Sequence, residues 1–143
     1  MAIRFNSQDI KFVLKEKRKV GNWIKKIAQR HNKVVGELSI IFVSDSFILS
    51  INKQYLNHNY FTDIITFDYS EKDYIEGDIF ISIDTVKSNS EKFNTNFSNE
   101  ILRVIAHGVL HLLGFKDKMM NEQKEMRQNE DLALNLFYNG DNK

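Results

Sequence analysis

The sequence predicts an α+β fold, in which a small mixed β-sheet, mostly parallel with one antiparallel strand, is covered by about five helices. Three observations lead to this prediction. Strand-like segments alternate with amphipathic helical segments along most of the chain. Two of the strands are separated by a short acidic turn, which favours an antiparallel hairpin. One helix is apolar nearly all round, so it is expected to lie inside the molecule.

The first half of the chain predicts two helices and one buried strand. A first helix carries a single apolar stripe, formed by Val20, Trp23, Ile24, Ile27 and Ala28. The β-branched run ELSIIFVS at 37–44 is typical of a buried strand. Ser44 or Asp45 would cap a helix that runs to about Tyr55, with an inward face of Phe47, Ile48 and Ile51. The polar and aromatic segment 56–61 is expected to be a loop.

The middle of the chain predicts the hairpin and a short helix. DIITFDY at 63–69 and EGDIFISI at 76–83 have strand composition, and the turn between them is short and acidic. Asp84 is suited to cap a helix that runs to about Phe93.

The last third of the chain predicts two long helices. Ser98 would cap the apolar helix, and Gly114 would end it in the left-handed conformation. A final helix is expected from about Met119 to Tyr138, with Met126, Leu132, Ala133 and Leu136 buried. We interpret Met119, Met120 and Met126 as core-filling residues.

Composition narrows the chemistry that this chain can perform. The 143 residues correspond to one domain. Cysteine is absent, which excludes disulfides, thiolate metal sites and a cysteine nucleophile. A transition-metal site must therefore draw on the four histidines, namely His31, His58, His107 and His111, together with carboxylates. The first residues do not resemble a signal peptide and no stretch is apolar enough to span a membrane, so we expect no membrane association and a cytoplasmic location.

The net charge of +1 conceals an uneven distribution. Residues 1–33 contain ten Lys or Arg against two acidic residues, a local excess of +8, and the rest of the chain carries −7. A basic face of this kind attracts nucleic-acid phosphates, although a solvated face of an amphipathic helix has the same composition. Both interpretations stay open at this point.

The strongest chemical signal is a pair of histidines on the apolar helix. His107 and His111 are four residues apart, so both imidazoles project from one helix face and can reach a single ion. Gly114 turns the chain directly afterwards, and Asp117 follows close enough to bring its carboxylate to the same ion. Two nitrogens and one oxygen would leave a fourth position for water, as in catalytic zinc sites. We therefore expect His107, His111 and Asp117 to bind one Zn²⁺ per chain. Histidines bonded to backbone carbonyls are the structural alternative.

Several linked motifs resemble the YbeY family of bacterial rRNA-maturation metalloproteins. The family signature reads His-Gly-x-Leu-His-Leu-x-Gly-Tyr-Asp-His, and HGVLHLLGFKD at 107–117 matches it at His107, Gly108, Leu110, His111, Leu112 and Gly114. The segments SIIFVSDSFILSINKQY at 39–55, TDIITF at 62–67 and GDIFIS at 77–82 are similar to three further family blocks, in the same order and with the same spacing.

The resemblance implies a function for residues 1–143 as a single metal-dependent hydrolase domain. The implied activity is that of a zinc-dependent, single-strand-specific endoribonuclease with a metal-activated water at the His/His/Asp site. The implied role is 16S rRNA 3′-end maturation and ribosome quality control, with single-stranded rRNA and the small ribosomal subunit as partners. The N-terminal basic helix and the aromatic residues Tyr60 and Phe61 are candidate RNA contacts.

Two positions depart from the family pattern. Asp117 stands where the family has a third histidine, a replacement that zinc accepts because carboxylate oxygens also bind it. Leu56 stands where the family usually has an arginine, and His58 or Arg103 would have to take over any phosphate contact. No catalytic residue is assigned. Asp63 is either a candidate general base or a cap at the start of its strand.

Two other functions are compatible with the same residues. A zincin-like metallopeptidase also places two histidines on a helix and a third ligand after a glycine turn. The signature has Gly108 where the His-Glu-x-x-His peptidases carry their glutamate base, which argues against this activity. The second alternative is a non-catalytic ribosome-assembly factor in which the metal is structural.

Overall fold

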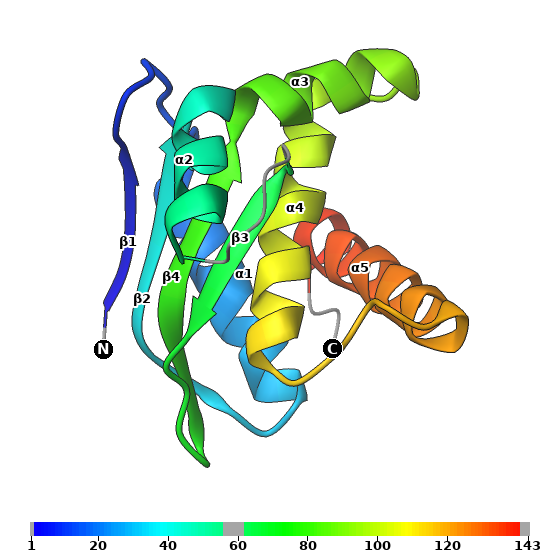
Figure 1. Cartoon of the computed structure of the whole chain (residues 1–143). Coiled ribbons are helices and arrows are strands. Elements are labelled where there is room, and N and C mark those ends of the chain that lie inside the picture. Colours follow the sequence, from blue (N-terminus) through cyan, green and yellow to red (C-terminus); the bar gives the residue numbers. More distant parts are fainter. Residues whose placement is uncertain (1, 56–61, 141–143) are drawn as a thin grey trace.

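The computed structural model describes residues 2–55 and 62–140, which form a four-stranded sheet with helices on both faces (Figure 1). The strands are β1 (Ala2–Ser7), β2 (Val34–Val43), β3 (Ile64–Asp68) and β4 (Tyr74–Ser82). The helices are α1 (Lys17–Arg30), α2 (Asp45–Tyr55), α3 (Ile83–Lys92), α4 (Phe97–Leu112) and α5 (Met120–Asn139). Among these described residues, no helix is both long and apolar enough to cross a membrane.

The strand order is β1-β2-β4-β3, and it confirms the predicted mixed sheet. β1 pairs parallel with β2 and β2 pairs parallel with β4, whereas β3 pairs antiparallel with β4. The antiparallel pair is the predicted hairpin, with Phe67 opposite Asp78 and Ile65 opposite Phe80. The α+β fold class inferred from the sequence is therefore confirmed.

The edge strand β1 was not among the predicted elements. Its outward residue Arg4 is exposed, while Ile3 and Phe5 on either side pack against the main core. This period-two alternation is the signal that identifies it in retrospect. The strand is six residues long and, within the part of the chain that the structure describes, pairs with β2 alone, so its position depends on a partner more than thirty residues away.

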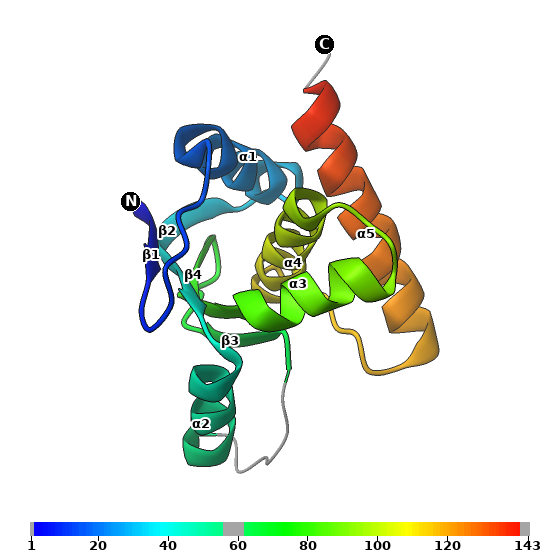
Figure 2. The ribbon, with the colours of Figure 1, turned by 90° about the horizontal axis from the view of Figure 1, so that it is seen from above.

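The two faces of the sheet build two cores of unequal size. Alternate residues along β2 explain this division, since Leu38, Ile40 and Phe42 belong to the larger core and Ile41 and Val43 to the smaller. The larger core lies under α1, α4 and α5, and the smaller one lies under α2. Figure 2 shows α2 on one side of the sheet and α1 and α4 on the other.

The starts of α3 and α4 differ from the sequence prediction. Ser82, not Asp84, caps α3, because its hydroxyl accepts a hydrogen bond from the Thr85 amide at 3.2 Å. Asp84 lies within the first turn of α3, and its carboxylate accepts from the Asp45 amide at 3.0 Å. Asn96, not Ser98, caps α4 by accepting from the Asn99 amide.

The inward face of α5 also differs from the prediction. Met126 is buried as expected, but Met119, Met120 and Leu132 are 63 %, 86 % and 65 % exposed. The two methionines lie at the start of the helix, outside the core. The inward stripe of α5 follows the helical spacing Met126, Glu130, Ala133 and Phe137, which turns position 132 outward. A glutamate therefore occupies a core position of this helix.

Candidate metal centre

The central helix α4 presents His107 and His111 on one face. Nine residues of α4 are buried against the sheet and the other helices, which fixes the rotation of the helix about its axis. The two histidines are half-buried on the side facing β3, and their Nε2 atoms lie 3.0 Å apart. The spacing of four residues produces this geometry, as the sequence predicted.

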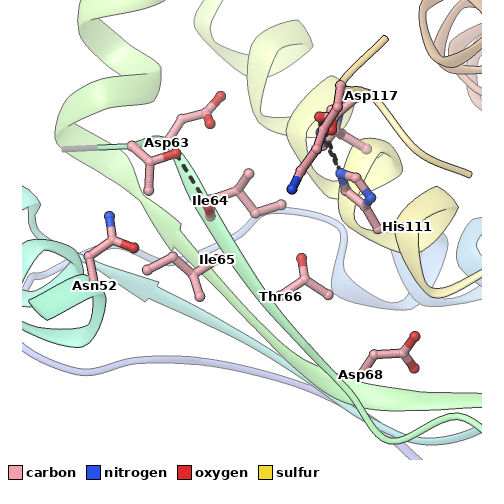
Figure 3. A pocket seen from close by; sticks show the side chains of 11 residues that line it. Asn52, Asp63, Ile64, Ile65, Thr66, Asp68, His111 and Asp117 are labelled. Atoms are coloured by element: carbon pink, nitrogen blue, oxygen red, sulfur yellow. Dashed lines mark hydrogen bonds and ion pairs between the residues drawn. The ribbon is translucent and has the colours of Figure 1, made fainter. Parts of the chain in front are cut away.

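A tight turn after α4 brings Asp117 to the two histidines. Gly114 has φ of +104°, and the Phe115 and Gly114 amides donate to the Leu110 and His111 carbonyls in the pattern of a helix C-terminal cap. The Asp117 Oδ2 atom lies 3.0 Å from His107 Nε2 and 3.3 Å from His111 Nε2. Figure 3 shows Asp117 and His111 meeting at the edge of the pocket. We call His107, His111 and Asp117 the His/His/Asp cluster.

The donor atoms of this cluster fit a metal ion. Within the described residues, they form a group whose ligand atoms all lie within 4.8 Å of one another. Ligands of a tetrahedral zinc ion, bound at about 2.0–2.1 Å, lie about 3.3 Å from each other, close to the separations of 3.0 to 3.3 Å found here. Lone pairs brought this close repel each other unless a cation or a proton lies between them.

A second carboxylate completes the surroundings of His107. Glu130 of α5 is 5 % exposed, and its Oε2 atom lies 2.6 Å from His107 Nδ1. Its Oε1 atom accepts a hydrogen bond from Arg103 at 2.9 Å. Glu130 was not among the predicted site residues because its contact with His107 joins residues 23 positions apart. The sequence signal that could have identified Glu130 is its position as a charged residue on the inward stripe of α5.

These contacts shift the pKa values of the pair. Burial acts to lower the pKa of His107, but the hydrogen bond and charge of Glu130, together with the charges of Asp117 and Asp63, raise it overall. Burial acts to raise the pKa of Glu130, but its bonds to His107 and Arg103 lower it overall. Glu130 is therefore ionised at neutral pH and acts only as a hydrogen-bond acceptor.

The His/His/Asp cluster lies at the side of an open cleft of about 690 Å³. The opposite wall is formed by β3 and the residues before it, and Asn52 of α2 contributes at one end (Figure 3). Asp63 lines this cleft, and burial raises its pKa despite the opposing charge of His107.

Gly108 allows α4 to lie close against the sheet. A Cβ atom at this position would lie 2.9 Å from Ile64 Cδ1 and 3.0 Å from two atoms of Ile79. Real Cβ atoms do not approach neighbours this closely without displacing them. The position that carries the glutamate base in His-Glu-x-x-His peptidases is thus filled here by the neighbouring strands.

The other predicted RNA contacts have different outcomes. Leu56, His58, Tyr60 and Phe61 lie outside the described residues. Arg103 binds Glu130 and Asp131 through its two terminal nitrogens and lines a neighbouring cavity instead of the cleft, so its role as a substitute for the family arginine stays a prediction. The basic helix α1 packs on β2, α4 and α5, and none of the described residues that line the cleft comes from it.

The fold and the cluster define this chain as a candidate metalloprotein, in which a central helix and the turn after it offer two imidazoles and a carboxylate to one ion. Comparison with known families agrees with the motifs. The family model described as "Endoribonuclease YbeY" matches residues 2–138, and the chain belongs to the YbeY family.

Individual relatives extend over nearly the whole chain. Proteins named "Endoribonuclease YbeY" from Parabacteroides distasonis and Bacteroides fragilis are each 48% identical to this chain, over 137 and 134 residues. These alignments cover 96% and 94% of this chain, and 96% of each relative. A solution structure of a Thermotoga maritima protein matches with a TM-score of 0.69 and 25% identity, and covers 96% of this chain and 90% of that one.

Proposed function

We propose that residues 1–143 form a single metal-dependent hydrolase domain that acts as a single-strand-specific endoribonuclease. We further propose that Zn²⁺ is its metal, that its role is 16S rRNA 3′-end maturation and ribosome quality control, and that it works in the cytoplasm with the small ribosomal subunit. Membership of a family whose model is described as an endoribonuclease supports the activity. The observation that carries the proposal is the convergence of three ligand atoms in the cleft.

His107, His111 and Asp117 would hold the metal, and all three offer atoms that zinc accepts. When bound, zinc supplies Lewis acidity toward a phosphoryl oxygen and lowers the pKa of water. The chain itself supplies orientation: α4 fixes two ligands, the Gly114 turn fixes the third, and β3 forms the facing wall. The cleft therefore holds an extended RNA strand against the cluster.

The test compares cleavage of an unstructured, end-labelled RNA with cleavage of casein, using protein loaded with zinc. His111→Ala and Asp117→Ala should each lose RNA cleavage by about a hundredfold or more, because each removes a ligand. Asp73→Ala, which removes an exposed carboxylate at the β3–β4 turn, is the matched control and should retain full activity.

Each alternative function has its own signature in this experiment. Casein proteolysis that is lost in Asp117→Ala, with RNA left intact, would identify a metallopeptidase. Ribosome association that is unchanged in a folded His111→Ala variant, with no cleavage of either substrate by the native chain, would identify an assembly factor. Less than about 0.1 zinc per chain after mild purification would contradict the catalytic-metal proposal.

A further inference from the structure

Glu130 is a charged residue in a position that packing alone would give to an apolar one. It lies on the inward stripe of α5 between Met126 and Ala133, and it is as buried as its apolar neighbours. Burial of a carboxylate is costly unless it is paired, and replacement of buried ion pairs by apolar residues is often neutral or stabilising. The carboxylate at this position therefore calls for a reason other than stability.

Both oxygens of Glu130 are engaged by α4, and by different residues. Oε2 contacts His107 Nδ1 at 2.6 Å, and Oε1 contacts the Arg103 NH1 atom at 2.9 Å. Arg103 and His107 are one helical turn apart, so they hold the carboxylate from two sides. The second terminal nitrogen of Arg103 binds Asp131 at 2.7 Å, which fixes the guanidinium in turn.

This arrangement determines which nitrogen of His107 carries the proton. An ionised carboxylate only accepts hydrogen bonds, so the short contact requires a hydrogen on Nδ1. The neutral ring then has its lone pair on Nε2. Nε2 is the atom that lies 3.0 Å from both the Asp117 carboxylate and the His111 ring. The contact between Glu130 and Nδ1 therefore determines whether Nε2 of the neutral ring offers a lone pair to a metal.

We propose that Glu130, held by Arg103, is a positioning residue that fixes the His107 ring in the orientation and tautomer needed to bind the metal. The inference rests on the proposed function, because it assigns a role toward the metal of the same site. Glu130 touches neither substrate nor ion in this role. It acts through His107 alone, and its loss should weaken metal binding while the His/His/Asp cluster remains complete.

The experiment measures zinc affinity of Glu130→Gln by competition with a chromogenic chelator. The dissociation constant should rise by about ten- to a hundredfold relative to the native chain, because a neutral amide is a weaker acceptor for His107. The visible absorption of the Co²⁺-loaded variant should shift or weaken, since this spectrum reports the ligand field. Glu125→Gln is the matched control. It changes an exposed carboxylate on the same helix, α5, and its zinc affinity should stay within about twofold of the native value.

A purely structural role for Glu130 predicts a different result. It would lower the unfolding temperature of the metal-free variant while leaving the zinc dissociation constant and the Co²⁺ spectrum unchanged, and this outcome would overturn the inference. Failure of the native chain to bind zinc or Co²⁺ at all would instead contradict the proposed function. The two failures are therefore distinguishable.

A measurement on the native chain covers the case in which Glu130→Gln does not fold. Nitrogen-15 NMR of the metal-free protein, at a pH where the histidines are neutral, distinguishes the two imidazole tautomers. We expect His107 to carry its hydrogen on Nδ1, with the resonance assigned by comparison with His107→Gln. A hydrogen on Nε2 would contradict the inference.

Discussion

Asp117 gives the His/His/Asp cluster a negative charge. A cluster of three neutral histidines would carry none. An ion at the cluster would therefore be held more tightly by electrostatics than at a site with three neutral ligands. The same charge makes the centre less positive, which reduces its effect on the acidity of nearby water. With a metal bound, this one carboxylate would therefore strengthen metal binding and reduce the acidity of bound water, relative to a third histidine at the same position.

Asp63 provides a prediction about pH. Its pKa in the folded chain is raised by burial, so the folded state binds this proton more readily than the unfolded state does. The free energy of unfolding therefore falls as pH rises from the usual carboxyl value through the folded pKa. Asp63→Asn removes the ionisable carboxyl group, and with it this fall in the free energy of unfolding. The metal-free variant should be more stable than the native chain at pH 7, with a difference that shrinks toward pH 4.

Urea unfolding of the metal-free proteins at several pH values checks this expectation. Asp73→Asn, which changes an exposed side chain in the turn between β3 and β4, is the control. A difference for Asp63→Asn that is constant between pH 4 and 7 would show that burial of the charged form is not its cause.

At the scale of single residues, the site residues that are close in sequence were predictable, whereas the one that comes from a distant segment was not. His107, His111 and Asp117 lie within eleven residues of each other, and helix periodicity with one turn brings them together. Glu130 reaches His107 from another helix, and its partner depends on how α4 and α5 cross. Sequence periodicity marks it as inward but does not reveal what it touches.

Among the secondary-structure elements, α2 and α3 are joined through their first turns. The Asp45 carboxylate accepts hydrogen bonds from the hydroxyls of Ser82, at 2.5 Å, and Thr85, and Asp84 accepts from the Asp45 amide. Each helix start thus satisfies polar groups of the other. The link lies at the end of β4, and β4 pairs with β3, the strand that forms the wall of the cleft.

Ser82→Ala should therefore lower the free energy of unfolding by about 1–3 kcal/mol. It removes the cap of α3 and leaves the Asp45 carboxylate with one donor fewer. Chemical denaturation measures the change. Ser50→Ala is a control in an exposed part of α2 and should change stability by less than about 0.5 kcal/mol. Equal effects of the two variants would contradict the role assigned to the Ser82 hydroxyl.

The element predictions succeeded where the pattern was strong within one segment. The apolar helix, the hairpin and β2 each carry enough buried residues to be recognised alone. β1 is short and lies at the sheet edge, and its partner strand specifies it more than its own six residues do. Helix starts shifted by one or two residues because several neighbouring Ser, Asp and Asn side chains compete for the same cap.

At the scale of the whole molecule, the basic helix α1 and the cleft lie in different regions. The basic helix α1 packs over β2, on the opposite face of the sheet from α2, whereas the cleft lies between α4 and β3 (Figure 2). Because α1 contributes no residue among those described around the cleft, we expect its lysines to hold RNA at a distance from the cluster. They would then affect binding and not the chemical step.

Lys25→Gln combined with Lys26→Gln tests this separation. RNA binding should weaken, and its dependence on salt should fall by about 0.7 in the logarithmic slope for each lysine that contacts a phosphate of a single strand. Cleavage at saturating RNA should stay unchanged. Lys87→Gln on α3 is the control for loss of an exposed lysine. A fall in the saturated rate with an unchanged salt slope would contradict a binding role for α1.

The turn that carries Asp117 has a consequence for the dynamics of the chain. It connects the C-terminal end of α4 to the start of α5, and its carboxylate points back to α4. An ion bound there would cross-link the connector to the helix before it, so local opening of the connector would require release of the ion. Amide hydrogens of residues 113–119 should then exchange more slowly with solvent when zinc is present. The exchange rate of this connector would therefore indicate whether the metal site is occupied.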